Sequence, residues 1–268
     1  MHYVLATVVV IGAVAILAWA SAAASHRPKL DPATGCQTGT KPSKTVGFIL
    51  DSTDPLGSEN PRRVDAAVNG LIDRVGSGDL VLLVPILGEA PNEVVPAFGR
   101  CAPIRPEQVS YFTGGNPRLQ AAAFSKDFAA PLLASVGRIR AMPDAPRSPI
   151  AEVISGVASD QTFLSGQQRE IDVLTDGLEN ANGQDAYHRH FRLRPAPKGL
   201  LSGTTVKFYL LRNPGATGFQ TEALVVAWTE WVENAGGKFQ LNAPWLTGRD
   251  TEGLLASIRP PAGGRPKG

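Results

Sequence analysis

The sequence predicts a doubly wound α/β domain, a mostly parallel sheet with helices on both faces. Two observations support this fold class. Short apolar runs have the length and composition of strands buried on both faces, and segments with helical spacing of apolar residues alternate with them. Strand, helix and strand that follow one another through short connections form right-handed parallel crossovers. We therefore expect one α/β domain over residues 45–258.

The first half of this domain begins with a mostly apolar strand at residues 45–50, which is followed directly by oxygen-bearing side chains. Residues 61–75 carry apolar side chains at helical spacing, and Gly76 and Gly78 end that helix. A second apolar strand follows at residues 79–87. The Pro- and Gly-rich stretch after it contains a possible short edge strand at residues 109–112, and residues 124–142 return to a helical pattern.

In the second half, Pro149 after Ser148 is typical of a helix start. Strands are expected at residues 170–175 and 203–211. A long polar loop at residues 181–202 lies between them, and we predict that this loop is mobile and outside the core. The remaining expected elements are an amphipathic helix at 219–234 with a stripe of Leu224, Val225, Trp228 and Trp231, an edge strand at 236–241, a closing helix at 251–258 and a disordered tail at 259–268.

The N-terminus has the composition of a membrane segment. Residues 3–24 contain no charged side chain and are long enough to span a bilayer as a helix. We expect residues 1–25 to be a transmembrane anchor or a signal. A cleavable signal is the alternative because Ala20, Ala22 and Ala24 give small-x-small cleavage patterns, although no Lys or Arg precedes the apolar core. Residues 26–44 are expected to be a linker.

Two signals disagree about the side of the membrane. Arg27, Lys29 and further lysines follow the apolar segment, which favours a cytoplasmic domain by the positive-inside rule. Cys36 and Cys101, an even pair in a membrane-targeted chain, favour a disulfide in an oxidising compartment, with two unrelated thiols as the alternative. We expect a periplasmic or extracytoplasmic domain.

Overall charge gives no indication of a nucleic-acid partner, and none is expected. The 268 residues carry a formal charge of +2, which is close to neutral for this length. A local basic run at residues 187–194 could contact anionic lipid or nucleic acid, but such runs are more often solvated loops.

Oxygen side chains gather where two predicted strands end. Asp51, Ser52 and Thr53 follow the first strand, and Asp176 follows the strand at residues 170–175. Ser148 lies in a loop just before a helix. The carboxyl ends of parallel strands are where ligands bind in open α/β sheets, and such oxygens suit a hard divalent cation. The alternative is a polar turn in which Asp54 or Ser58 caps the next helix.

The order Asp51-x-Thr53, Ser148 loop, Asp176 resembles the metal-ion-dependent adhesion site of the von Willebrand factor type A (VWA) domain family. The family pattern is DxSxS, a loop Thr, and a later Asp. Asp51 matches the first acid, Thr53 the first hydroxyl, Ser148 the loop Thr and Asp176 the last acid. Pro55 stands where the second Ser is expected and has no side-chain oxygen, so that ligand is missing unless Asp54 or Ser58 replaces it.

The resemblance implies Mg²⁺ or another divalent cation held by Asp51, Thr53, Ser148 and Asp176, with an open position filled by an acidic side chain of a protein partner. We therefore expect a membrane-anchored protein-interaction domain. The alternative is a structural or accessory envelope component in which these side chains only bond one another.

An enzyme is not expected. A nucleophilic Asp at a strand end also occurs in haloacid-dehalogenase-like phosphatases, but Thr53 stands where their second acid is required, and no Lys lies near Asp176. The sequence also contains no phosphate-binding P-loop and no hydrolase nucleophile motif. A phosphatase-like hydrolase is the least favoured interpretation.

Overall fold

The structure is a computed structural model that describes residues 12, 14, 29–53, 60–88, 94–109, 115–181, 183–187 and 191–243. Its centre is a six-stranded sheet in the order β3-β2-β1-β4-β7-β8. The strands are β1 (Lys44–Asp51), β2 (Leu80–Ile86), β3 (Phe98–Cys101), β4 (Gln168–Thr175), β7 (Thr204–Leu210) and β8 (Lys238–Asn242). Only β3 runs antiparallel to its neighbour. The chain is therefore a Rossmann-like α/β domain with a mixed, mostly parallel sheet.

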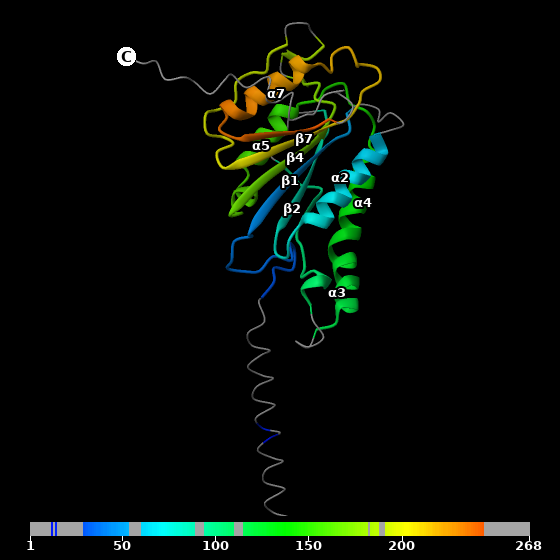
Figure 1. The fold of residues 1–268 in the computed structure, drawn as a ribbon, viewed down its shortest axis with the longest axis vertical. Coiled ribbons are helices and arrows are strands. Elements are labelled where there is room, and N and C mark those ends of the chain that lie inside the picture. The colour runs from blue at the N-terminus through cyan, green and yellow to red at the C-terminus, as the bar shows by residue number, and fades with distance from the viewer. Residues whose placement is uncertain are drawn as a thin grey trace, which may run out of the picture.

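Helices cover both faces of the sheet (Figure 1). They are α2 (Asn60–Arg74), α3 (Pro117–Phe124), α4 (Ala130–Arg140), α5 (Ile150–Ser159), α6 (Gln161–Leu164) and α7 (Glu222–Asn234). Successive side chains of β1 point to opposite faces of the sheet, so they pack alternately against the helices on one face and those on the other. Phe48 packs with α2 and α4, whereas Ile49 packs with α5, α6 and α7.

Gly47 allows the second layer to approach β1 closely. A Cβ atom at this position would lie 2.7 Å from Val157 Cγ1 of α5 and 3.5 Å from the Phe163 ring of α6. Contacts below 3.0 Å force a shift of side chain or backbone, so only glycine suits this strand position. This close packing fixes α5, and with it the loop that precedes α5, against the sheet.

The direction of chain growth reverses between β1 and β4. From β1 the chain passes through α2 to β2 on one side, whereas from β4 it passes to β7 and then through α7 to β8 on the other. In open α/β sheets a crevice forms at the carboxyl ends of the strands at such a switch point, where ligands bind. Asp51 ends β1 and Asp176 follows β4, so both lie at this position.

Two sequence-based expectations between β2 and α5 need correction. The edge strand lies at β3 rather than at residues 109–112; Val109 follows a 3₁₀ turn (η1, Pro106–Gln108), and residues 110–112 lie outside the described residues. The helix expected at 124–142 begins earlier, at Pro117, because Asn116 caps it by accepting hydrogen bonds from Arg118 N and Leu119 N. A π-helical turn (η3, Ser125–Ala129) then joins α3 to α4.

The connection at residues 181–202 is also more structured than its polar composition indicates. It contains β6 (Gln184–Asp185), which pairs with β5 (Asn180–Ala181). Leu201 is fully buried, and Phe191 and Leu193 pack against the core. Trp231 Nε1 of α7 donates a hydrogen bond to Arg194 O at 3.0 Å. Scattered apolar residues thus fasten this loop to α7, and its described part is not outside the core.

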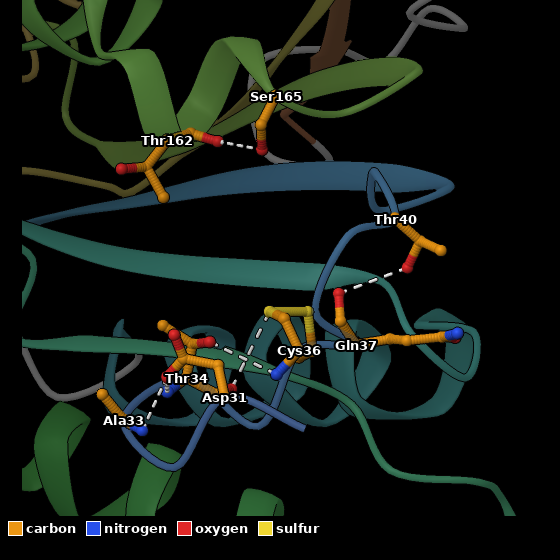
Figure 2. Close-up of a disulfide and its surroundings, with 9 residues drawn as sticks. Asp31, Ala33, Thr34, Cys36, Gln37, Thr40, Thr162 and Ser165 are labelled. Carbon is orange, nitrogen blue, oxygen red and sulfur yellow. Dashed lines mark hydrogen bonds between the residues drawn. A yellow bond between two sulfur atoms is a disulfide. The ribbon is translucent and has the colours of Figure 1, made fainter. Parts of the chain in front are cut away.

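The predicted disulfide between Cys36 and Cys101 is present, with a Cα–Cα distance of 4.9 Å. It fastens the residues before β1 to β3 (Figure 2). Asp31 accepts hydrogen bonds from Ala33 N and Thr34 N, and Cys101 N donates to Thr34 O. The expected linker is therefore folded onto the domain from Lys29 onward.

Within the described residues, no helix has the length and apolar character needed to cross a membrane. The expected anchor or signal at residues 1–25 lies outside them except for residues 12 and 14, as do the expected helix at 251–258 and tail at 259–268.

Candidate functional site

The candidate site is a cluster of hydroxyl groups around the Asp51 carboxylate. Thr53 Oγ1 donates to Asp51 Oδ1 at 2.7 Å, and Ser148 Oγ donates to Asp51 Oδ2 at 3.0 Å. Thr175 Oγ1, from the end of β4, donates to the same Oδ2 at 2.7 Å. The structure thus brings three of the four predicted residues, Asp51, Thr53 and Ser148, into direct contact, and adds Thr175.

Backbone pairing places Ser148 beside β5, the short strand that follows β4. Ser148 N donates to Asn180 O and Asn180 N donates to Ser148 O, both at 3.1 Å. Ala145 N also donates to Thr53 O at 2.9 Å. The loop between α4 and α5 is therefore tied to the residues that follow both β1 and β4, which explains how a side chain distant in sequence reaches Asp51.

Asp176, the fourth predicted residue, is held by the loops that follow β4 and β7. Its Oδ1 accepts from Leu178 N at 2.9 Å, and its Oδ2 accepts from Asn213 Nδ2 at 2.8 Å. Gln220 Nε2 donates to the Asp176 carbonyl at 2.9 Å. Gly177 adopts φ +78°, a left-handed conformation that glycine accepts most readily, so the chain turns sharply after Asp176.

A neutral acid lies behind the cluster. Glu179 is fully buried, and burial raises its pKa to about 9, against the hydrogen bond that Ala151 N donates to Oε2. The neighbouring Glu152 carboxyl and the charge of Asp51 add to this rise. Glu179 is therefore protonated at neutral pH.

The sequence reasoning missed Thr175, Glu179, Asn213 and Gln220. Thr175 directly precedes Asp176, so a search for hydroxyls at strand ends could have found it. Asn213 and Gln220 lie far along the chain, and only the parallel pairing of β7 with β4 brings their loop to Asp176. No local pattern distinguishes Glu179 from a solvated glutamate, because its burial depends on the packing of α5.

The donor chemistry of the cluster fits a hard cation. A hydroxyl has one proton and two lone pairs. Thr53, Ser148 and Thr175 each use their proton on Asp51. The lone pairs of Thr53 and Ser148 remain available as ligands, whereas Thr175 Oγ1 already accepts a hydrogen bond from Gly177 N at 3.0 Å. Among the described residues, no group of three or more His, Cys, Asp or Glu could hold a metal, which is compatible with this cluster because most of its donors are hydroxyls. Asp54, Pro55 and Ser58, on which the completeness of the family pattern depends, lie outside the described residues.

Comparison with known proteins gives only distant structural likenesses. Neither a scan against protein-family models nor a search of curated proteins found a match. The chain is similar to a D319A mutant of the PilB minor pilin from Streptococcus sanguinis, with 11% identity and a TM-score of 0.45 over 85% of this chain and 61% of the pilin chain. It thus spans about three fifths of that protein.

A second likeness is to an aerotolerance-related membrane protein from Bacteroides fragilis NCTC 9343 with multiple mutations to serines. The identity is 14% and the TM-score 0.37, over 79% of this chain and 95% of the other. Both likenesses are loose, so the fold assignment rests on the strand order and on the layers of helices described above.

Proposed function

We propose that the chain is a membrane-anchored, VWA-like interaction domain that binds a protein partner at the carboxyl edge of its sheet through a divalent cation. One observation carries this proposal: three hydroxyl side chains from separate segments converge on Asp51 at the point where the strand order reverses. Ligand sites in open α/β sheets form at this position.

In this proposal Thr53, Ser148 and Asp51 hold Mg²⁺ or a similar cation, with Asp176 as the second acid. The ion supplies a positive centre that accepts an acidic side chain of the partner. Asp51 orients the hydroxyl oxygens, because each of their protons is directed at its carboxylate. Asn213 and Leu178 position the Asp176 carboxylate in turn.

The disulfide supports a domain outside the cytoplasm. Bonds between cysteines persist in oxidising compartments and are rare where thiols are kept reduced. Cys36 and Cys101 are bonded, and no cysteine is left free. With the uncharged segment at residues 3–24 as the anchor, the disulfide supports a domain on the periplasmic or extracytoplasmic side.

The second candidate function is a structural or accessory envelope component with the same fold and no metal. It is favoured by the hydrogen bonding of Asp51, whose two oxygens already accept four bonds, from Thr53 N, Thr53 Oγ1, Ser148 Oγ and Thr175 Oγ1. A carboxylate satisfied in this way is stable in a buried turn without an ion.

Calorimetric titration of Mg²⁺ into the full chain in nanodiscs separates these functions. Ser148→Ala removes one proposed ligand, and Ser135→Ala is its control. Ser135 is an equally buried serine on α4 whose hydrogen bonds are to Ala97, Pro131 and Arg138 and to none of the cluster residues. We expect saturable binding by the wild type and by Ser135→Ala, and binding roughly tenfold weaker, about 1.4 kcal/mol, in Ser148→Ala. A wild type that binds no Mg²⁺ overturns the metal-dependent function.

A further inference from the structure

The end of the domain opposite the candidate site is formed by three segments that we call the base: residues 29–41, residues 102–109 and α3. Covalent and hydrogen bonds join them. Cys36 is bonded to Cys101, which directly precedes the second segment. Gln120 Nε2 of α3 donates to Ile104 O at 2.7 Å. Figure 1 shows α3 beyond the end of the sheet at which β1 begins. The base is therefore one continuous surface at the amino end of β1.

Each segment of the base exposes one large apolar side chain. Leu30 is 60% exposed, Ile104 55% and Leu119 69%. Leu119 is the exposed large apolar side chain of α3, whose core contact is made by Phe124. Single exposed apolar side chains are common on protein surfaces, and what distinguishes these three is that each segment of the same end of the domain contributes one.

The base also carries an excess of positive charge. Lys29, Lys41 and Arg118 are exposed and make no ion pair within the described residues. The two acids there are already engaged. Asp31 accepts backbone hydrogen bonds from Ala33 and Thr34, and Glu107 pairs with Arg105 at 3.4 Å. Apolar side chains mixed with unpaired basic ones match the boundary of an anionic bilayer.

The length of chain before Lys29 holds the base near a membrane. Only Ser25, His26, Arg27 and Pro28 separate Lys29 from the uncharged segment at residues 3–24. Fully extended, this connection spans roughly 18 Å. The disulfide ties Cys36 to Cys101 at the end of β3, so unfolding of the turn could lengthen the tether only by the residues that precede Cys36.

We propose that the base docks on a phospholipid bilayer with anionic head groups, so that the domain stands with its candidate site directed away from the membrane. Leu30, Ile104 and Leu119 enter the interfacial layer, and Lys29, Lys41 and Arg118 contact the head groups. This inference rests on the anchor of the proposed function. It adds the orientation of the domain, which leaves the carboxyl edge of the sheet accessible to a partner.

Tryptophan quenching by brominated lipid tests the docking in the full chain. The chain is reconstituted in nanodiscs of phosphatidylglycerol and brominated phosphatidylcholine, as wild type, Leu119→Trp and Leu87→Trp. Leu87 is the matched control because it is 52% exposed and follows β2 at the opposite, carboxyl end of the sheet. Subtraction of the wild-type signal isolates the added tryptophan.

We expect the tryptophan at position 119 to lose most of its fluorescence and the one at position 87 to keep it. Equal loss at both positions, or none at 119 while Trp19 is quenched, overturns the docking and leaves the anchor in place. Unquenched Trp19 overturns the anchor and the docking together.

In discs without phosphatidylglycerol the loss of fluorescence at position 119 should fall sharply, and an unchanged loss contradicts recognition of anionic lipid. Asp176→Ala should leave all these signals unchanged, which separates docking from the metal site.

Discussion

Acidic side chains gather at both ends of β4, and the two groups are balanced in different ways. Near its beginning, Glu170 bonds to Lys44 at 2.9 Å, to Arg74 at 2.9 Å and to Lys207 at 2.8 Å, while Arg74 also pairs with the fully buried Asp172. Beyond its end, Asp51 is bonded by hydroxyls and a backbone N–H, with no ion pair among the described residues.

The pKa values reflect this difference. Burial opposes ionisation of Glu170, but hydrogen bonds from Lys207 and Lys44 hold its pKa at about 2. Burial raises the pKa of Asp172 to about 6, against the attraction of Arg74. At the other end Glu179 has a pKa of about 9, chiefly through burial. The first cluster is thus neutralised by cations of the chain itself. The second combines the neutral Glu179 with the Asp51 carboxylate, which has no ion pair among the described residues, and strongly shifted pKa values such as that of Glu179 are typical of functional sites.

Removing the disulfide should have the largest effect, because it closes the amino end of the fold. The bond spans a sequence separation of 65 residues. Closing a loop of that length stabilises a domain by about 4 kcal/mol. We expect the double variant Cys36→Ser/Cys101→Ser to lose most of this stabilisation, measured as the free energy of unfolding in denaturant. A loss below about 1 kcal/mol, a quarter of the expected value, would show that the base stays folded without the bond.

Breaking the internally neutralised cluster should cost nearly as much. Arg74→Met leaves Asp172 and Glu170 buried with less compensating charge, and we expect a loss of about 3 kcal/mol in the free energy of unfolding. Arg140→Met is the control, since Arg140 pairs with the exposed Asp65, and it should cost at most about 0.5 kcal/mol. Equal losses of unfolding free energy in Arg74→Met and Arg140→Met would contradict the view that burial makes the ion pairs of Arg74 more costly to break than an exposed pair.

Glu179→Gln should stabilise the domain at alkaline pH. Between the ordinary pKa of 4.5 and the folded value of about 9, only the folded state holds the proton. Unfolding therefore releases a proton, and stability falls as the pH rises through this window. Glutamine removes that penalty, so we expect a gain on the order of 2 kcal/mol at pH 8 and little change at pH 4. Thermal melts across this range should show a flatter profile for the variant, and a parallel profile would mean that Glu179 ionises normally.

The sequence allowed prediction of features that depend on local patterns. Apolar runs located β1, β2, β4 and β7, the helical stripe located α7, and strand ends located Asp51 and Asp176. The cysteine count and the membrane segment predicted the disulfide.

Features that depend on tertiary contacts were not predictable in the same way. The turn after Lys29 has the composition of a linker, and only its bond to Cys101 and the hydrogen bonds of Asp31 fold it onto the domain. The hydroxyl of Thr175 becomes part of the site because β1 and β4 lie side by side, which places it beside Asp51. The alternation of strands and helices predicts neither contact.

The central claim is that the carboxyl end needs an external cation and the amino end does not. Thermal melts of the full chain, as wild type and Asp176→Ala, each with and without Mg²⁺, test it most directly. With Mg²⁺ at ten times its Kd, we expect the wild type to gain about 1.4 kcal/mol and Asp176→Ala to gain little. A wild-type melt indifferent to Mg²⁺, together with a more stable Asp176→Ala variant, would contradict the claim, because repulsion between two neighbouring acids is relieved when one is removed.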